Sequence, residues 1–463
     1  MKRCSERRVN RQRRRGPNTR HPEPTSSLPT PAINPPADNS LSTTPFTFRC
    51  GLPSRSTVCL PPELLIMVAS YLDAPGLLKF SQICRVWWEL ARPFVFHSLV
   101  IKSAAREMEL SKFFVAHPDQ AKCVRSLTYI GPQPTRNLQG NLGPWESWFG
   151  DRPKLYGLLP NLVVLSLNRF HRLTNGSHAS FLRELGRGFC SVKRLAVGSC
   201  YGHPHAFTAL ISSLDNLEVL SLNLVAANRK YTMDQAQEPV AGAPCDLPRL
   251  TTLAIGHACG LEDSISHFQS LRSLRNLGLC WDFRQPLLDG MNEGYLNMLR
   301  QEDVRVDSLM LRFAIPSQRN VKEAVIKIAD DFSRAFKLPS LQATSRLAFA
   351  GVPINAVSTM LDAVATRDNN LRRVRIDLAD EDNRLFVVGE GGSKDTKEHC
   401  GSIDKVLSQR KFLERGIKVE VLSCLCTHEE GNELRLEVEL LESMFPMLVR
   451  AKAFKFNPCI CAA

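Results

Sequence analysis

The residues of this 463-residue chain that are best suited to chemistry lie near its C-terminal end. Sulfur and imidazole groups of the kind that bind Zn²⁺ stand at Cys424, Cys426, His428, Cys459 and Cys461. The C-x-C spacing is shorter than the gap of about two to four residues that usually separates paired zinc ligands, so ordinary thiols are favoured. No metal site is therefore predicted.

Motifs for catalysis are also missing. The chain contains neither H-E-x-x-H, which places zinc ligands on a helix, nor G-x-S-x-G, which presents a nucleophilic serine. Residues 389–394, GEGGSK, have the composition of a phosphate-binding loop but not its spacing. His203-Pro204-His205 fits a loop. We therefore expect no catalytic residue and no cofactor, and a function that depends on binding.

The segment from Leu60 to Ala91 is the best candidate for a binding element. Its residues 64–69 are apolar without a polar break, and a helix that is apolar on nearly every face cannot leave its back to water. About thirty residues are too few to bury such a surface alone, and the run is far shorter than the roughly twenty residues of a membrane span. The segment predicts helices that dock on a partner. A helical hairpin inside a larger core is the alternative.

Three short helices are expected in this segment. Pro61 and Pro62 suit the first turn of one helix, where a missing amide proton costs little. Residues 73–76, DAPG, form a turn with a capping residue and a proline before a second helix. A third helix ends at Pro93, and its apolar stripe is Ile83, Val86, Trp87 and Leu90. Strand-like alternation then follows at Phe94, Phe96, Leu99 and Ile101.

These residues resemble the F-box family. Its elements occur in order as Leu60-Pro61-Pro62-Glu63, Leu64, Leu65, Val68, Tyr71-Leu72, Leu77-Leu78 and Cys84-Arg85-Val86-Trp87. The match covers about a tenth of the chain, and Gly76 stands where the family usually has an acidic or polar residue. The resemblance implies a helical motif that binds a Skp-family adaptor and, through it, a cullin–RING ubiquitin ligase. The adaptor contacts that it implies are Leu60, Pro61, Glu63, Leu64, Val68, Leu72, Leu77, Leu78, Cys84 and Trp87.

A second pattern follows, a six-residue segment with aliphatic residues at its first, fourth and sixth positions, L-x-x-L-x-L. Clear copies lie at residues 162–167, 192–197, 217–222, 250–255 and 274–279, and weaker ones at 306–311 and 371–376. They resemble a divergent leucine-rich repeat, which implies stacked strand–helix units with a parallel sheet and outer helices. The Asn or Cys that usually follows is present only as Cys200, whereas Phe170, Val225 and Asp282 occupy the same offset elsewhere. An ordinary α/β domain is the alternative.

The residues between the repeated aliphatics should face away from the core, because side chains alternate along a strand. This row comprises Ser166, Asn168, Ser221, Asn223, Gly278, Cys280, Met310, Arg312, Arg373 and Arg375. We expect Arg312, Arg373 and Arg375 to bind a protein target with acidic or phosphorylated groups, and Asn168 and Asn223 to contribute. Alternatively, the arginines are solvated or paired with Asp377 and its neighbours, or the insertion at 228–245 binds the target.

The net charge of +13 is concentrated at the beginning of the chain. The first twenty residues hold nine Lys or Arg and one Glu, so about five positive charges remain for the rest. A nucleic-acid-binding domain is therefore not indicated. Residues 1–56, basic and then rich in Pro, Ser and Thr, are predicted to be a disordered arm. The arm has the composition of a nuclear import signal, of a ligand for nucleic acid or acidic lipid, or of a solvated tail.

Together these patterns predict an α/β protein with a disordered arm at 1–56, a helical F-box at 57–97 and a leucine-rich-repeat-like solenoid at 98–463. The implied function is a substrate-recognition subunit of an SCF-type cullin–RING ubiquitin ligase. The alternatives are a scaffold that binds the adaptor without the cullin, or a nuclear interaction scaffold that uses the basic arm. Fifteen cysteines without framework spacing suggest reduced thiols in the nucleus or cytoplasm. No segment reaches membrane-spanning length, and no membrane partner is expected.

Overall fold

The computed structural model describes the chain between residues 61 and 458 in most of its parts. The described residues are 61–131, 155–170, 176–202, 204–223, 226–227, 245–256, 265, 268–282, 296–314, 332, 335–350, 352, 354–365, 370–377, 394–423 and 442–458. The predicted arm at 1–56, nearly all of the insertion at 228–245 and the cysteines near the C-terminal end lie outside them.

Three helices open the described chain, as predicted: α1 (Pro62–Tyr71), α2 (Ala74–Ser81) and α3 (Arg85–Val95). The Asp73 side chain accepts a hydrogen bond from the Gly76 amide at 2.9 Å and so caps α2. The prediction that Pro93 ends α3 is wrong, because the helix continues through it to Val95. A proline in the last turn removes one helical hydrogen bond, which the rest of the turn tolerates. Phe94 is consequently helical, and the strand that follows begins only at Ser98.

A small core holds these helices together. Its buried members are Leu65, Ala69, Leu77, Phe80 and Ala91, with Leu72, Trp87, Leu90, Phe94 and Val95 packed against them. The rings of Phe80 and Trp87 lie 4.0 Å apart between centroids and join α2 to α3. This cluster is separate from the larger core under the sheet.

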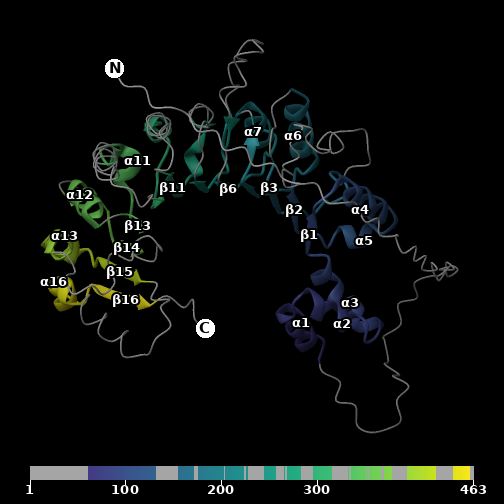
Figure 1. Ribbon diagram of the computed structural model, residues 1–463, viewed down its shortest axis with the longest axis horizontal. Coiled ribbons are helices and arrows are strands. Elements are labelled where there is room, and N and C mark those ends of the chain that lie inside the picture. The colour runs from purple at the N-terminus through teal and green to yellow at the C-terminus, as the bar shows by residue number, and fades with distance from the viewer. Residues whose placement is uncertain are drawn as a thin grey trace, which may run out of the picture. The chain divides into compact units, whose positions relative to one another are not determined.

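Within the described residues, twelve strands form one fully parallel sheet (Figure 1). Their order is β1 (Ser98–Ile101), β2 (Ser126–Ile130), β3 (Val164–Asn168), β4 (Arg194–Gly198), β6 (Val219–Asn223), β9 (Thr252–Gly256), β11 (Asn276–Asp282), β12 (Ser308–Ala314), β13 (Arg346–Ala350), β14 (Arg373–Asp377), β15 (Lys418–Ser423) and β16 (Phe454–Pro458). Each strand lies beside the preceding and following ones of this list, an arrangement that fits a solenoid. Two pairs of two-residue strands accompany it: β5 (Tyr201–Gly202) with β7 (Ala226–Ala227), and β8 (Cys245–Asp246) with β10 (Phe268–Gln269).

The helices that connect the strands lie on one face of the sheet, and no described helix covers the other face (Figure 1). We call the latter the helix-free face. The connecting helices are α4 (Ala104–Ala116), α5 (Pro118–Ala121), α6 (Gly176–Gly188), α7 (Pro204–Ile211), the 3₁₀ turn η3 (Leu271–Ser273), α11 (Pro339–Gln342), α12 (Ile354–Ala365), α13 (Lys394–Leu407), α14 (Arg410–Glu414) and α16 (Pro446–Arg450). Helix α13 begins at Lys394, the last residue of the GEGGSK segment.

The repeated aliphatics build the core beneath the sheet, as predicted. In every copy named above, the three aliphatic residues are almost fully buried, as Leu162, Leu165 and Leu167 illustrate. One copy escaped prediction because it begins with a polar residue, Thr344, ahead of Leu347 and Phe349. The Thr344 hydroxyl is buried and donates to the Val306 carbonyl at 2.9 Å, so its burial is compensated.

Successive strands of the sheet are joined where they begin by a recurring pair of backbone hydrogen bonds. The carbonyl just before a strand accepts the amides of two consecutive residues on the next strand; the Arg125 carbonyl, for example, binds the amides of Val163 and Val164. The same pairing recurs from His97 to Ser345. It sets a common register, so that equivalent positions of neighbouring strands stand side by side.

Tyr129 and Cys200 are polar residues inside the large core that form hydrogen bonds there. The Tyr129 hydroxyl donates to Glu107 Oε1 at 2.8 Å, and burial raises the pKa of Tyr129 well above its usual value. Burial also raises the pKa of Cys200 to about 12, so this thiol stays protonated and stands 3.5 Å from the Leu167 carbonyl of the preceding turn. Cys200 thus contacts the preceding repeat, while Phe170 fills the same offset of its own repeat with a buried ring.

Candidate docking surfaces

The three N-terminal helices expose a dense group of large apolar side chains. Leu64, Ile66, Met67, Val68, Tyr71, Leu78 and Ile83 are between 41% and 85% exposed. In the remainder of the described chain, only four other large apolar side chains are comparably exposed: Val100, Val115, Met310 and Met447. Such a concentration within twenty residues marks an interaction surface, because scattered apolar residues are common but contiguous ones are not.

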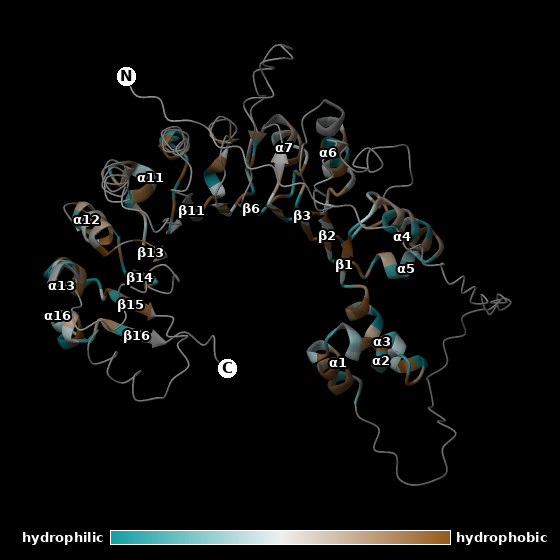
Figure 2. Cartoon of the chain, in the orientation of Figure 1, coloured by the Kyte–Doolittle hydropathy of each residue, from teal (hydrophilic) through white to brown (hydrophobic). Residues whose placement is uncertain are grey.

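Helix geometry explains how α1 serves both the core and this surface. Leu65 and Ala69, four residues apart, are buried and face α3 and α2. The exposed stripe is formed by Leu64, Met67, Val68 and Tyr71, at the i, i+3, i+4 and i+7 spacing of a single helix face. Figure 2 colours much of α1 as hydrophobic. One apolar face therefore holds the helix in place, and a second apolar face stays exposed.

The residues predicted to contact the adaptor differ in their exposure to solvent. Pro61, Glu63, Leu64, Val68 and Leu78 are exposed; Leu72, Cys84 and Trp87 are half-buried; Leu77 is buried; and Leu60 lies outside the described residues. Leu77 and Trp87 pack in the three-helix core and support the exposed face from below. Sequence reasoning did not select the exposed residues Ile66, Met67, Tyr71 and Ile83 as contacts. The apolar run at residues 64–69 contained a signal for the first two only.

The large side chains that this surface exposes are mainly apolar. Among the described residues, no group of three or more His, Cys, Asp or Glu side chains is placed to hold a metal ion. No helix in the same residues is long and apolar enough to cross a membrane.

The helix-free face of the sheet is the second surface. All five residues predicted to contact a target lie on it: Asn168, Asn223, Arg312, Arg373 and Arg375. The two asparagines lean over glycines of the next strand, since a Cβ on Gly198 would stand 2.5 Å from Asn168 Oδ1, and one on Gly256 3.0 Å from Asn223 Oδ1. Their amides therefore lie along the sheet surface.

The arginines are partly paired, as the alternative interpretation anticipated. Arg373 Nε lies 3.9 Å from Glu420, and Arg375 lies 4.0 Å from Asp377, with both guanidinium groups about half exposed. Such long and exposed pairs contribute little to stability. Two further cations, Arg346 and Lys418, were not predicted to belong here. Register places both beside Arg373.

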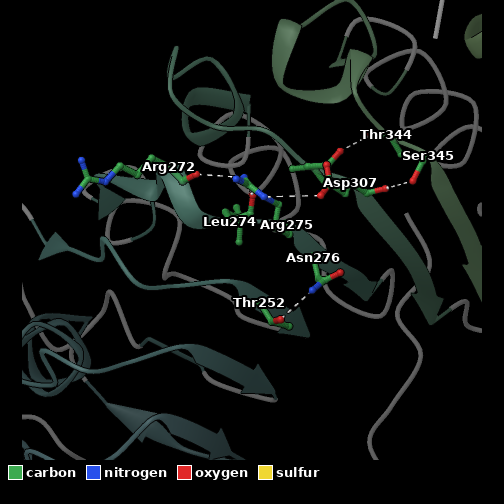
Figure 3. A network of polar contacts seen from close by, with 9 residues as sticks. Thr252, Arg272, Leu274, Arg275, Asn276, Asp307, Thr344 and Ser345 are labelled. Carbon is green, nitrogen blue, oxygen red and sulfur yellow. Dashed lines mark hydrogen bonds and ion pairs between the residues drawn. The ribbon is translucent and has the colours of Figure 1, made fainter. Parts of the chain in front are cut away.

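The edge where the middle strands begin carries a connected set of polar contacts (Figure 3). The Arg275 guanidinium donates to the carbonyls of Arg272 and Leu274 at 3.1 and 3.0 Å and lies 3.7 Å from Asp307. On the next turn, Ser345 donates to the Asp307 carbonyl at 3.3 Å. The side chains of Arg275 and Asp307 are therefore engaged with each other at this edge.

Comparison of the sequence with known protein families identifies the segment that carries the first surface, the exposed apolar residues of the N-terminal helices. Residues 57–102 match the F-box-like family model, which spans α1 to α3 and β1. No curated protein matches the chain. The chain thus contains an F-box-like domain, and a large parallel sheet with helices follows it.

Proposed function

We propose that this chain is a substrate-recognition subunit of an SCF-type cullin–RING ubiquitin ligase. In this proposal, the F-box-like domain docks on a Skp-family adaptor, and the sheet recruits a protein target for ubiquitination. The observation that carries the proposal is the exposed apolar stripe of α1, together with Leu78 and Ile83, inside a segment that matches the F-box-like model.

The size of this apolar surface supports an obligatory partner. Burying one Leu side chain contributes roughly 1.5–3 kcal/mol, and seven large side chains are available here. Part of that gain is offset by the loss of translational and side-chain freedom on association. The remainder is ample for stable binding.

The second part of the proposal assigns the target to the sheet. A subunit of this kind needs no catalytic residue, because it accelerates modification by holding the target near an enzyme bound elsewhere in the assembly. A rigid sheet with one face clear of described helices is a suitable platform for a protein ligand.

Adaptor binding is tested by changing both Leu64 and Leu78 to Ala in the full-length chain. Both side chains are exposed, so the fold should be unaffected while the docking area shrinks. We expect the affinity for a purified Skp-family adaptor, measured by calorimetry, to fall at least about tenfold.

Val115→Ala is the matched control, because Val115 is 66% exposed on α4, outside the F-box-like domain. It should bind the adaptor like the unchanged chain. Unaltered adaptor affinity in the folded double variant would overturn the docking assignment. Recovery of adaptor without cullin from cells would favour the non-proteolytic scaffold.

A further inference from the structure

We infer that the helix-free face over β13–β15 binds an acidic segment of the protein target through Arg346, Arg373 and Lys418. These three residues are called the cationic row. The inference rests on the proposed function, because it names the chemical class of the target that the sheet would recruit. The shared chemistry of such a segment is anionic oxygen, supplied either by Asp and Glu or by phosphorylated residues.

Strand register brings the cationic row together. Arg346 on β13 is the direct neighbour of Arg373 on β14, which is the direct neighbour of Lys418 on β15. Neighbouring strands lie about 4.8 Å apart, so the three positions span about 10 Å. All three side chains are exposed on the helix-free face. Three cations are thus presented side by side from a rigid backbone.

Within the described residues, the protein neutralises this row only in part. Like charges directly opposite each other on adjacent strands destabilise a sheet, and here two such pairs follow in succession. Arg373 has Glu420 at 3.9 Å, whereas Arg346 and Lys418 form no ion pair with another described residue. Elsewhere at the beginnings of the strands, Lys193 meets Glu218 at 2.7 Å and Arg275 meets Asp307 at 3.7 Å. An anionic ligand would relieve a repulsion that the other strands avoid.

Neighbouring residues favour a protein segment over a nucleic acid. Met310 on β12 is 47% exposed on the same face, between Gly278 and Ala348 in register. An exposed methionine between such small residues offers an adaptable apolar contact. A peptide can supply both acidic and apolar side chains. Between Arg194 on β4 and the cations of β12–β15, in contrast, the outward positions of β6 and β9 carry no charged residue, so the face has no continuous track for a phosphate backbone.

The test uses the full-length chain in complex with a Skp-family adaptor. The probes are three short fluorescent peptides of one sequence containing leucine, in which the variable positions are all Glu, all phosphoserine or all Ser. A labelled single-stranded oligonucleotide of similar length is the fourth probe. Fluorescence anisotropy at physiological salt should show binding of an acidic peptide and none of the Ser peptide, and the Glu and phosphoserine arms identify the source of the anion.

Three variants assign the binding to the row. Changing Arg346, Arg373 and Lys418 together to Glu should lower the affinity for the acidic peptide at least about tenfold. Arg194→Glu is the matched control, because Arg194 is an exposed cation at the equivalent register position on β4. It should leave binding unchanged. The triple change to Gln should also weaken binding without lowering the melting temperature, because it removes like-charge repulsion.

The outcomes separate this inference from the proposed function. If the unchanged chain binds the adaptor but neither acidic peptide, the inference is wrong and the adaptor assignment stands. Tighter binding of the oligonucleotide than of both acidic peptides, or acidic-peptide binding that survives the triple change to Glu, would also overturn it. Failure of the unchanged chain to bind the adaptor would instead count against the proposed function.

Discussion

The F-box-like helices and strands β13–β15 expose opposite kinds of side chain. The helices present Leu64, Met67, Val68 and Tyr71 as an apolar stripe, whereas the strands present Arg346, Arg373 and Lys418 as a row of cations. The two regions also rest on separate cores. One chain can therefore offer two surfaces with different binding chemistry, and a change in one region need not disturb the other.

The difference predicts different responses to salt. Apolar docking gains its free energy from the removal of surface from water and depends little on ionic strength. Contacts between exposed charges are screened over about 8 Å at physiological salt and weaken as salt rises. Binding at the two surfaces should thus be separable by salt as well as by mutation.

The largest predicted effect is a loss of stability in the core of the three N-terminal helices that leaves the core beneath the sheet intact. Phe80→Ala removes a buried ring that contacts Trp87 between α2 and α3. A substitution of this kind costs about 3–5 kcal/mol, which a core of five buried residues can hardly absorb. Hydrogen exchange should show loss of amide protection in α1–α3 and unchanged protection in β6–β12. Loss of protection in both regions would mean that the two cores unfold as one.

A smaller effect is expected at the far end of the sheet. Asp404 on α13 is buried, and its carboxylate accepts the amides of Met447 and Leu448 at 2.9 and 2.8 Å, at the beginning of α16. Asp404→Ala leaves these amides without that acceptor and should cost about 1–3 kcal/mol. Faster amide exchange should be confined to α13, α16 and β16, and adaptor binding should stay intact. Lys405→Ala, an exposed neighbour on the same helix, is the control.

The smallest effect concerns the repeat that begins with a polar residue. Thr344→Val restores an aliphatic at that position and removes the hydrogen bond to the Val306 carbonyl. The apolar gain and the lost bond oppose each other, so the free energy of unfolding should change by less than about 1.5 kcal/mol. Thermal melting measures this change. A much larger loss would show that the hydroxyl is essential for stacking β13 on β12.

Most of the fold could be predicted from the spacing of apolar residues along short segments of the sequence. The aliphatic pattern predicted the core residues from Leu162 to Ile376 because the side-chain alternation of a strand is readable from a few neighbours. It failed at Thr344, whose burial depends on a carbonyl from the preceding turn. The strand-like alternation from Phe94 to Ile101 was misleading at Phe94, because the preceding helix tolerates Pro93 in its last turn and extends to Val95.

The surfaces were harder to predict than the core. The apolar run at residues 64–69 predicted a helix that docks on a partner. The sequence did not show which face of that helix is exposed, because this depends on how α2 and α3 pack against it. Arg346 and Lys418 were missed because nothing in their own segments shows that they adjoin Arg373. That neighbourhood arises from the register of strands separated by tens of residues in the sequence.

One paired measurement tests the central claim that the two surfaces act separately. The Leu64→Ala/Leu78→Ala chain and the chain with Arg346, Arg373 and Lys418 changed to Glu are each assayed against the Skp-family adaptor and the better-bound acidic peptide, at low and high salt. The account predicts that the first variant loses the adaptor and keeps the peptide, that the second does the reverse, and that only peptide binding falls steeply with salt. Loss of both ligands in either folded variant, or equal salt dependence of the two, would contradict it.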